Sequence, residues 1–290
     1  MKIIEMTIQF YMNDNFHKIV YRDGYSGSCR WWSGGDKGAV LYLHGIQSHG
    51  LWFEQSADAL ARLGFNVLLP DRRGSGRNEP ARGDVRDYQQ WISDHVELIK
   101  WLSEKTGYDR VHVIGVSWGG KIAMALARVL PRQIASLTLI SPGIFPVVDV
   151  AWETKFKIAM AVIFRRKKYF PIPLNEPELF TGNPDRQEFI RQDPLRLTAV
   201  TGDFLYQSRR LDRFIRRIPE RLAMPMKMFL AGRERIIDNQ ATIRYYRSLR
   251  TAGSKELILY DQACHTLEFE KDNRIFIRDL QEWLEHASNV

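Results

Sequence analysis

Long apolar runs are missing from this sequence of 290 residues. The longest candidate, Ile158 to Phe164, is far shorter than the roughly 20 residues that span a bilayer. The basic run Arg165 to Lys168 follows it, so we expect that this segment can touch a membrane surface but cannot cross one. Residues 1–15 are interrupted by acidic and amide side chains and contain no small-residue cleavage site, so they do not predict a secretory signal.

Cysteine is scarce, with only Cys29 and Cys264 in the whole chain. The two could pair in principle. In a chain of this length with no predicted secretory signal, two cysteines are more typical of free thiols in a reducing compartment. The cytoplasm is therefore the expected location.

Nucleic-acid-binding motifs are also missing, although the formal net charge is +8. The basic residues gather in Arg165 to Lys168 and in the stretch 207–217, without zinc-finger spacing, an RNA-recognition signature or a basic heptad region. No nucleic-acid partner is expected. Two interpretations of the basic residues remain, a solvated face and attraction to an anionic substrate or membrane surface. The oligomeric state is not predicted.

Short apolar runs predict strands at 39–43, 66–69, 111–116, 135–140, 226–230 and 257–260. The continuous runs at 39–43 and 111–116 are typical of buried strands. Segments with helical periodicity lie between these runs. Regular alternation of strand and helix predicts an α/β fold with a parallel sheet covered on both faces. Ahead of it, alternation within 6–32 around the turns at Asn13-Asp14-Asn15 and Asp23-Gly24 predicts antiparallel strands.

One region interrupts the alternation of predicted strands and helices. The stretch 145–222 is rich in proline and basic residues, is helical in places, and has no buried-strand run. Because it lies between two predicted strands of the sheet, it predicts an inserted helical cap, here called the cap segment. The core domain is then formed by 1–144 and 223–290.

The pentapeptide Gly115-Val116-Ser117-Trp118-Gly119 fits the pattern G-x-S-x-G. A predicted buried strand precedes it and an apolar helix follows it directly. A serine on such a sharp turn exposes its hydroxyl and faces a helix N-terminus, which favours a developing oxyanion. We therefore interpret Ser117 as a nucleophile; the alternative is a glycine-rich turn with a capping serine.

A serine nucleophile needs a histidine base and an acid that orients it. Downstream of Ser117 there are two histidines, His265 directly after the last predicted strand and His286 in the tail after the last predicted helix. Position favours His265. The loop after 226–230 offers two acids, Glu234 at the turn and Asp238, which could equally cap the helix that begins near Asn239. Glu234 is favoured and Asp238 remains open.

An oxyanion hole can form where the first buried strand ends in His44-Gly45-Ile46. A tight turn there can aim the backbone N–H of Ile46 at the reaction centre, beside that of Trp118. We interpret His44 itself as structural.

These motifs resemble those of the α/β-hydrolase family, and more narrowly its monoacylglycerol lipase, lysophospholipase and serine aminopeptidase-like branch. The resemblance is carried by Leu43 to Ile46, Asp71 to Gly76, Gly115 to Gly120, Ala231 to Asp238, and Ala263 to His265. It implies an α/β-hydrolase fold with a mostly parallel eight-stranded sheet, helices on both faces and a helical cap. It also implies a triad of Ser117, Glu234 and His265, although Glu234 stands where the family usually has aspartate. Asp71 to Gly76 matches a family turn that we interpret as scaffold.

The resemblance further implies a serine esterase that cleaves carboxylic esters through an acyl-enzyme, without metal or organic cofactor. Acyl glycerols, lysophospholipids and small acyl esters are the expected substrates. A peptide or amide hydrolase, an acyltransferase and a non-catalytic binding module are the alternatives. Apolar and basic residues of the cap segment could line a lipid site, or simply pack the cap and face water.

Overall fold

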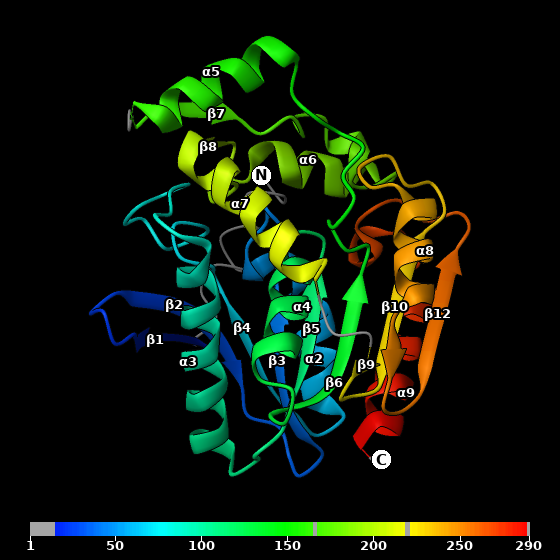
Figure 1. Ribbon diagram of the computed structural model, residues 1–290. Coiled ribbons are helices and arrows are strands. Elements are labelled where there is room, and N and C mark those ends of the chain that lie inside the picture. The colour runs from blue at the N-terminus through cyan, green and yellow to red at the C-terminus, as the bar shows by residue number, and fades with distance from the viewer. Residues whose placement is uncertain (1–14, 165–166, 218–220, 289–290) are drawn as a thin grey trace, which may run out of the picture.

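The computed structural model describes residues 15–164, 167–217 and 221–288. Its centre is an eight-stranded sheet in the order β1-β2-β4-β3-β5-β6-β10-β12 (Figure 1). The strands are β1 (Phe16–Val20), β2 (Ser26–Trp32), β3 (Gly38–Leu43), β4 (Phe65–Pro70), β5 (Val111–Val116), β6 (Ile134–Ile140), β10 (Met226–Ala231) and β12 (Lys255–Tyr260). The pairs β1/β2 and β2/β4 are antiparallel and the remaining pairs are parallel. The predicted mostly parallel sheet of eight strands is confirmed.

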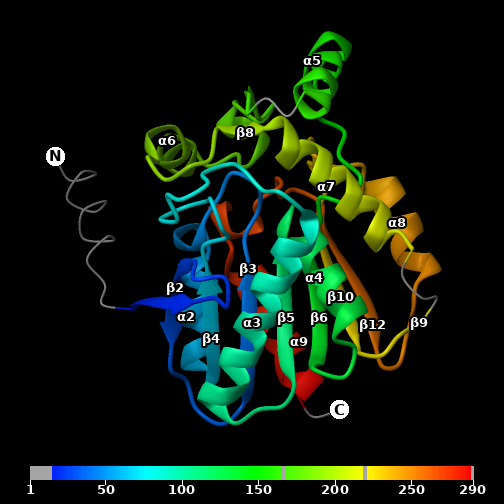
Figure 2. The same cartoon turned by 60° about the vertical axis from the view of Figure 1, so that its left-hand side comes forward.

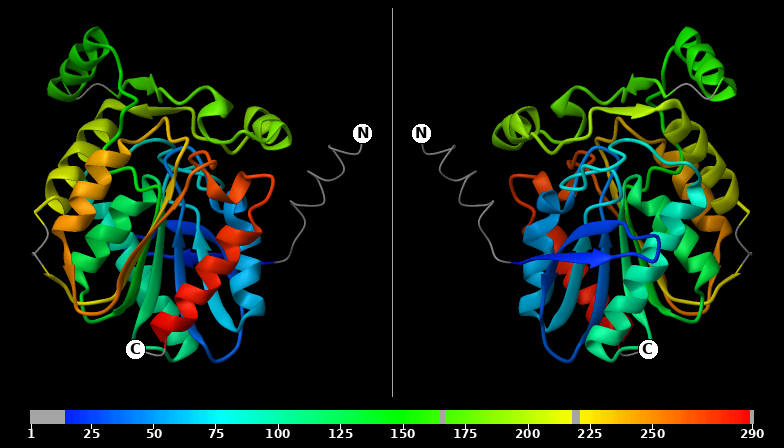
Figure 3. Two further views of the ribbon diagram at one scale, coloured as in Figure 1. Left: turned by 90° about the vertical axis from the view of Figure 1, so that its right-hand side faces the viewer. Right: turned by 90° about the vertical axis from the view of Figure 1, so that its left-hand side faces the viewer.

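Helices cover both faces of this sheet (Figure 3). One face carries α3 (Tyr88–Thr106), α4 (Gly119–Val129) and α8 (Asn239–Ser248), and the other carries α2 (Glu54–Arg62) and α9 (Arg274–Ser288). The central strands therefore bury both sets of alternating side chains, which is why they read as continuous apolar runs.

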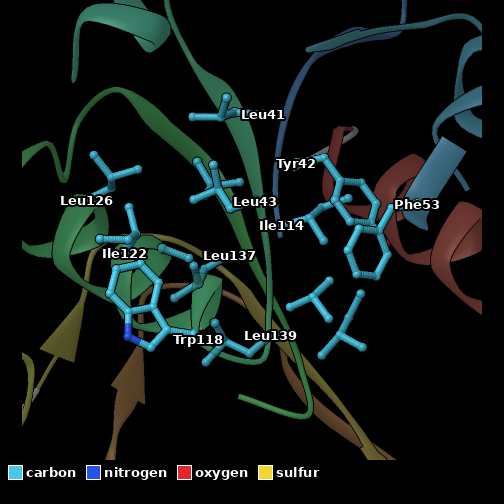
Figure 4. Close-up of a cluster of buried hydrophobic side chains, with 14 of the residues drawn as sticks. Leu41, Tyr42, Leu43, Phe53, Ile114, Trp118, Ile122, Leu126, Leu137 and Leu139 are labelled. Atoms are coloured by element: carbon cyan, nitrogen blue, oxygen red, sulfur yellow. The ribbon is translucent and has the colours of Figure 1, made fainter. Parts of the chain in front are cut away.

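Strand β3 illustrates this two-sided burial, since all six of its residues are buried. Leu41 and Leu43 point to the side of α4, whereas Tyr42 points to the opposite side (Figure 4). There the ring of Tyr42 stacks on Phe53 with 5.6 Å between centroids. Phe53 ends the short 3₁₀ helix η1 (Gly50–Phe53) that leads into α2.

The predicted antiparallel strands near the N-terminus are present as β1 and β2. Gly24 in the turn between them has φ +80°, a conformation that glycine adopts at low cost. The earlier part of that prediction, residues 6–14 with most of the Asn13-Asp14-Asn15 turn, lies outside the described residues.

The cap segment lies over the edge of the sheet where the parallel strands end (Figure 2). It contains α5 (Trp152–Ile163), β7 (Tyr169–Pro171), η2 (Pro177–Leu179), α6 (Pro184–Gln192), β8 (Ala199–Thr201), α7 (Gly202–Ile215) and β9 (Arg221–Leu222). Two short strand pairs were not predicted: β7 pairs with β8, and β9 pairs with β11 (Arg250–Thr251). Strands of two or three residues leave no apolar run in the sequence.

A buried polar contact ties the cap segment to the core. Asp193, after α6, lies 2.9 Å from His49 Nε2 through its Oδ2, which also accepts a hydrogen bond from Trp52 Nε1 at 2.8 Å. Burial alone would raise the pKa of Asp193, but the hydrogen bond to His49 and the charge of that ring hold the pKa below its usual value. The contact joins the cap to the loop that follows β3.

The C-terminal helix corrects one prediction. His286 was expected in a tail after the last helix, but α9 continues to Ser288 and includes it. The reason is that Leu284 and Ala287 extend the buried apolar face of the helix. Cys29 and Cys264 are free thiols, as expected. Among the described residues, no helix is both long and apolar enough to cross a membrane.

Candidate active site

Ser117 stands on the sharp turn between β5 and α4, with φ +50°. The glycines of the motif are required by close contacts. A Cβ on Gly115 would lie 2.7 Å from Ala123 Cβ, and one on Gly119 would lie 2.6 Å from the carbonyl oxygens of Leu43 and His44. The turn can therefore form only with glycine at both positions, and it holds Ser117 in a strained conformation.

Glu234 and His265 contact each other at the edge of the sheet where Ser117 also lies. Glu234 follows β10 and His265 follows β12, so both leave the same edge of the sheet as Ser117 does after β5. His265 Nδ1 lies 2.8 Å from Glu234 Oε2, and both side chains are almost fully buried. The other acid, Asp238, is the N-cap of α8 and accepts a hydrogen bond from Ala241 N at 2.9 Å. The geometry favours Glu234 as the partner of His265.

The surroundings of Glu234 keep it ionised. Burial alone would raise the pKa of the Glu234 carboxyl, but His265 lowers it by charge and hydrogen bond. The backbone N–H of Ile236, 2.7 Å from Oε1, lowers it further. The second ring nitrogen of His265, Nε2, is buried without a hydrogen-bond partner among the described residues. An ionised acid on Nδ1 and an open Nε2 suit a base that accepts a proton.

The loop after β3 comes close to Ser117, since a Cβ on Gly45 would lie 3.3 Å from Ser117 Cβ. Arg72 fixes this loop with two hydrogen bonds. Its Nη1 donates to the carbonyl of Gly45 and its Nη2 to that of Ile46, both at 3.0 Å. The Gly45 carbonyl and the Ile46 N–H belong to the same trans peptide and point in opposite directions. Because Arg72 binds the Gly45 carbonyl, the N–H of Ile46 points away from Arg72. Ile46 and Trp118 line the same cavity as Ser117.

Arg72 is a residue whose role the sequence did not reveal. Its guanidinium lies 4.6 Å from the centroid of the Trp118 ring, so one side chain contacts both segments that carry the expected oxyanion donors. Burial lowers the pKa of Arg72 to about 9. Its neighbour Asp71 does act as scaffold, since it accepts hydrogen bonds from Gly50 N and Arg77 N. In the sequence nothing separates Arg72 from the adjacent Arg73, which pairs with Asp94.

His44 lies near the site and is held by two hydrogen bonds. His44 Nδ1 bonds to the Gly45 carbonyl and its Nε2 accepts from the backbone N–H of Arg72, at 2.8 Å each. Burial lowers the pKa of His44 far below its usual value. His44 is therefore a neutral structural residue that fixes the loop.

Replacing Arg72 with methionine should lower kcat about 10- to 100-fold with little change in KM, because the expected oxyanion donor, the N–H of Ile46, would lose its alignment. Steady-state kinetics with thermal melting tests this. Arg110→Met, an exposed arginine at the opposite edge of the sheet, is the control and should leave both constants unchanged. An Arg72→Met enzyme with wild-type kcat would contradict the role given to Arg72.

A cavity of about 540 Å³ opens from Ser117 into the cap segment. Its walls are mainly apolar and come largely from α5, α7 and the loops after β6, β7 and β10. A few polar side chains also line it, among them Lys121, Ser208 and Asp212. Its volume is in the range of small-molecule sites.

Comparison with known proteins places the chain among hydrolases. The family described as serine aminopeptidase, S33 matches residues 34–272. The monoglyceride lipase of Rattus norvegicus is 24% identical over 277 residues, which is 94% of this chain and 91% of the lipase.

Solved structures give the same fold. A monoacylglycerol lipase from Paleococcus ferrophilus superposes with a TM-score of 0.79 at 20% identity, covering 90% of this chain and 99% of that one. A soluble variant of monoglyceride lipase from Saccharomyces cerevisiae, bound to a substrate analogue, superposes with a TM-score of 0.81 at 18% identity over 94% of each chain. The chain thus belongs to the serine aminopeptidase S33 family and has the α/β-hydrolase fold.

Proposed function

We propose that this protein hydrolyses monoacylglycerol-like esters through an acyl-enzyme intermediate on Ser117. Ser117 attacks the ester carbonyl while His265 takes its proton, and His265 then protonates the leaving alcohol. Glu234 orients His265, and the N–H groups of Ile46 and Trp118 stabilise the oxyanion. Water then releases the acid from Ser117 with His265 again as base. The observation that carries this proposal is the buried Glu234–His265 pair next to an apolar cavity that Ser117 lines.

The chain is a carboxylic ester hydrolase, and the charges of the cavity favour esters over aminoacyl amides. A site for a free α-amino group needs a carboxylate that is available to it. Among the described residues that line the cavity, the carboxylates are Asp149 and Asp212. Asp149 is paired with Lys155 at 2.5 Å and Asp212 with Lys121 at 2.7 Å. Neither is left for a substrate ammonium group.

We propose that the cap segment (145–222) sets the range of acyl chains. If the apolar walls hold the acyl group, kcat/KM should rise with acyl length until the cavity is full. Each buried methylene makes about 0.8 kcal/mol available, up to roughly fourfold. A series of monoacylglycerols from acetyl to palmitoyl, run beside aminoacyl anilides, measures this. Ala159→Trp should fill part of the cavity and shift the optimum to shorter chains. A flat profile, or faster cleavage of the anilides, would contradict the proposal.

We further propose that α5 rests on an anionic membrane surface. Ala161 is its one buried residue, whereas Trp152, Phe156 and Ile163 are 74%, 62% and 69% exposed. Their spacing of four and seven residues places them on one face of the helix. Lysines flank this face, and Ile163 also lines the cavity, so a lipid could pass from the surface to Ser117. Arg165 and Arg166 lie outside the described residues. Because Lys155 pairs with Asp149 and Lys167 with Asp84, the charge argument rests on Lys157 and Lys168.

Vesicle cosedimentation tests this contact. Binding to vesicles with anionic lipid should exceed binding to zwitterionic ones, weaken with salt, and fall in Trp152→Ser/Phe156→Ser. Val20→Ser, at an equally exposed apolar side chain on β1, is the control. Equal binding by the double variant would contradict the proposal, as would a dimer in solution that the double substitution dissociates.

A further inference from the structure

Three polar side chains interrupt the apolar wall of the cavity near Ser117. Lys121 on α4 pairs with Asp212 on α7, with 2.7 Å between Nζ and Oδ1. Ser208, one turn before Asp212, accepts a hydrogen bond from Trp118 Nε1 at 3.0 Å and lies 3.4 Å from Lys121 Nζ. All three are more than nine-tenths buried and all three line the cavity.

This cluster is poorly suited to a plain hydrocarbon chain. A buried ion pair loses the hydration of both charges, and apolar residues of similar size would often hold two helices together as well or better. Burial indeed lowers the pKa of Lys121, against the charge of Asp212. An alkyl chain laid over the cluster would exclude water from it without replacing the lost hydrogen bonds. A substrate that brings its own polar atom avoids this penalty.

The hydrogen-bonding capacity of the cluster indicates which polar atom fits. The ammonium of Lys121 has three N–H donors, and Asp212 and Ser208 account for two. Ser208 Oγ accepts hydrogen bonds from Trp118 Nε1 and Lys121 Nζ. Among the described residues, no acceptor is found for its own O–H. The cluster therefore offers donors to an incoming oxygen. Asp212 balances the buried charge of Lys121, and the other cation of this wall, Arg209, is exposed, so a neutral oxygen can bind at the cluster without leaving a buried charge uncompensated.

The place of the cluster fixes where that oxygen would lie. Lys121 lies in the first turn of α4, which begins two residues after Ser117. Ser208 accepts a hydrogen bond from the side chain of Trp118, the residue next to Ser117, so the cluster lines the part of the cavity that adjoins the nucleophile. We propose that Lys121, Ser208 and Asp212 form a subsite that selects acyl groups with a hydroxyl or keto oxygen near the ester carbonyl. The inference rests on the proposed ester hydrolysis and names the acyl class that the same site prefers.

Matched esters test the subsite. Wild-type enzyme should cleave ethyl 3-hydroxyoctanoate or ethyl 3-oxooctanoate with a kcat/KM about tenfold above that of ethyl octanoate. Ser208→Ala should reduce this ratio, and Lys121→Met/Asp212→Leu should bring it to about one. Both partners of the ion pair are replaced together because a single replacement would leave a buried unpaired charge.

Controls separate the subsite from general packing. Leu205→Ala, an apolar residue of the same cavity, should lower kcat/KM for all three esters and keep the ratio. Fluorophosphonate labelling and melting report whether each variant is folded, and Ser208→Ala alone decides the test if the double variant does not fold.

The outcomes are distinct. Equal kcat/KM for the three esters in the wild type, or a ratio that survives both sets of substitutions, would overturn the subsite and leave ester hydrolysis intact. If wild-type enzyme cleaves neither these three esters nor any monoacylglycerol of the length series, the proposed function itself is wrong.

Discussion

Replacing Ser117 with alanine should lower ester hydrolysis on the order of 10⁵-fold or more and abolish covalent labelling by a fluorophosphonate. The hydroxyl is the only group removed. The backbone keeps φ +50° with either residue, so the strain at the turn is the same and the melting temperature should change little. Kinetics, gel-based labelling and thermal melting together measure these effects.

An exposed serine provides the control. Ser248 lies at the end of α8, outside the residues that line the cavity, and Ser248→Ala should keep both activity and labelling. Labelling that persists in a folded Ser117→Ala protein would mean that another residue is the nucleophile.

Replacing Glu234 with glutamine should lower kcat on the order of 10⁴-fold. An amide can donate to His265 Nδ1 and so favour the tautomer that carries its proton on Nε2, where no proton can be accepted. The loss should appear in kcat, because the cavity walls that bind the substrate are unchanged. Steady-state kinetics on the best monoacylglycerol of the length series measures it.

The same substitution should alter the pH dependence of stability. The pKa of Glu234 lies below its ordinary value of 4.5 in the folded protein. A lowered pKa means that the folded state holds the ionised form more tightly than the unfolded state does. This stabilisation is present above pH 4.5 and is lost as the pH falls through the lowered pKa. The difference in melting temperature between wild type and Glu234→Gln should therefore shrink on acidification.

Asp238 is the matched comparison for Glu234. Its side chain caps α8, and asparagine caps helices as well as aspartate does. Asp238→Asn should keep kcat within about twofold of the wild type and change the melting temperature little. A loss of kcat in Asp238→Asn with an active Glu234→Gln would transfer the role of the acid to Asp238.

The features that could be predicted from the sequence are those that leave a pattern among neighbouring residues, such as an apolar run or a spacing of glycines. The central parallel strands were found because burial on both faces leaves continuous apolar runs, as in β3 and β5. The edge strand β12 also appears as an apolar run, although none of its residues is buried. The turn at Ser117 was found because it needs glycine at Gly115 and Gly119. The strand pairs β7/β8 and β9/β11 were missed because two or three residues leave no period to detect.

Contacts between distant residues could not be predicted in this way. Arg72 reaches the loop after β3 only through the folded sheet, and no spacing in the chain relates it to Ile46. Lys121 did leave a signal, since it is the one charged residue of α4 before Arg128 in the last turn. Its partner Asp212 lies 91 positions later on the cap segment, so the pair itself could be recognised only in three dimensions.

The contact between His49 and Asp193 has a consequence for protein engineering. Asp193 belongs to the cap segment, whereas His49 belongs to the loop that also carries Ile46. A chimera that exchanged 145–222 for the cap of another hydrolase would leave His49 buried without its acid, and the loop beside Ser117 would lose an anchor. Such a graft would have to supply a carboxylate at the position of Asp193. A cap exchange made to change the substrate range should therefore also disturb the loop beside Ser117.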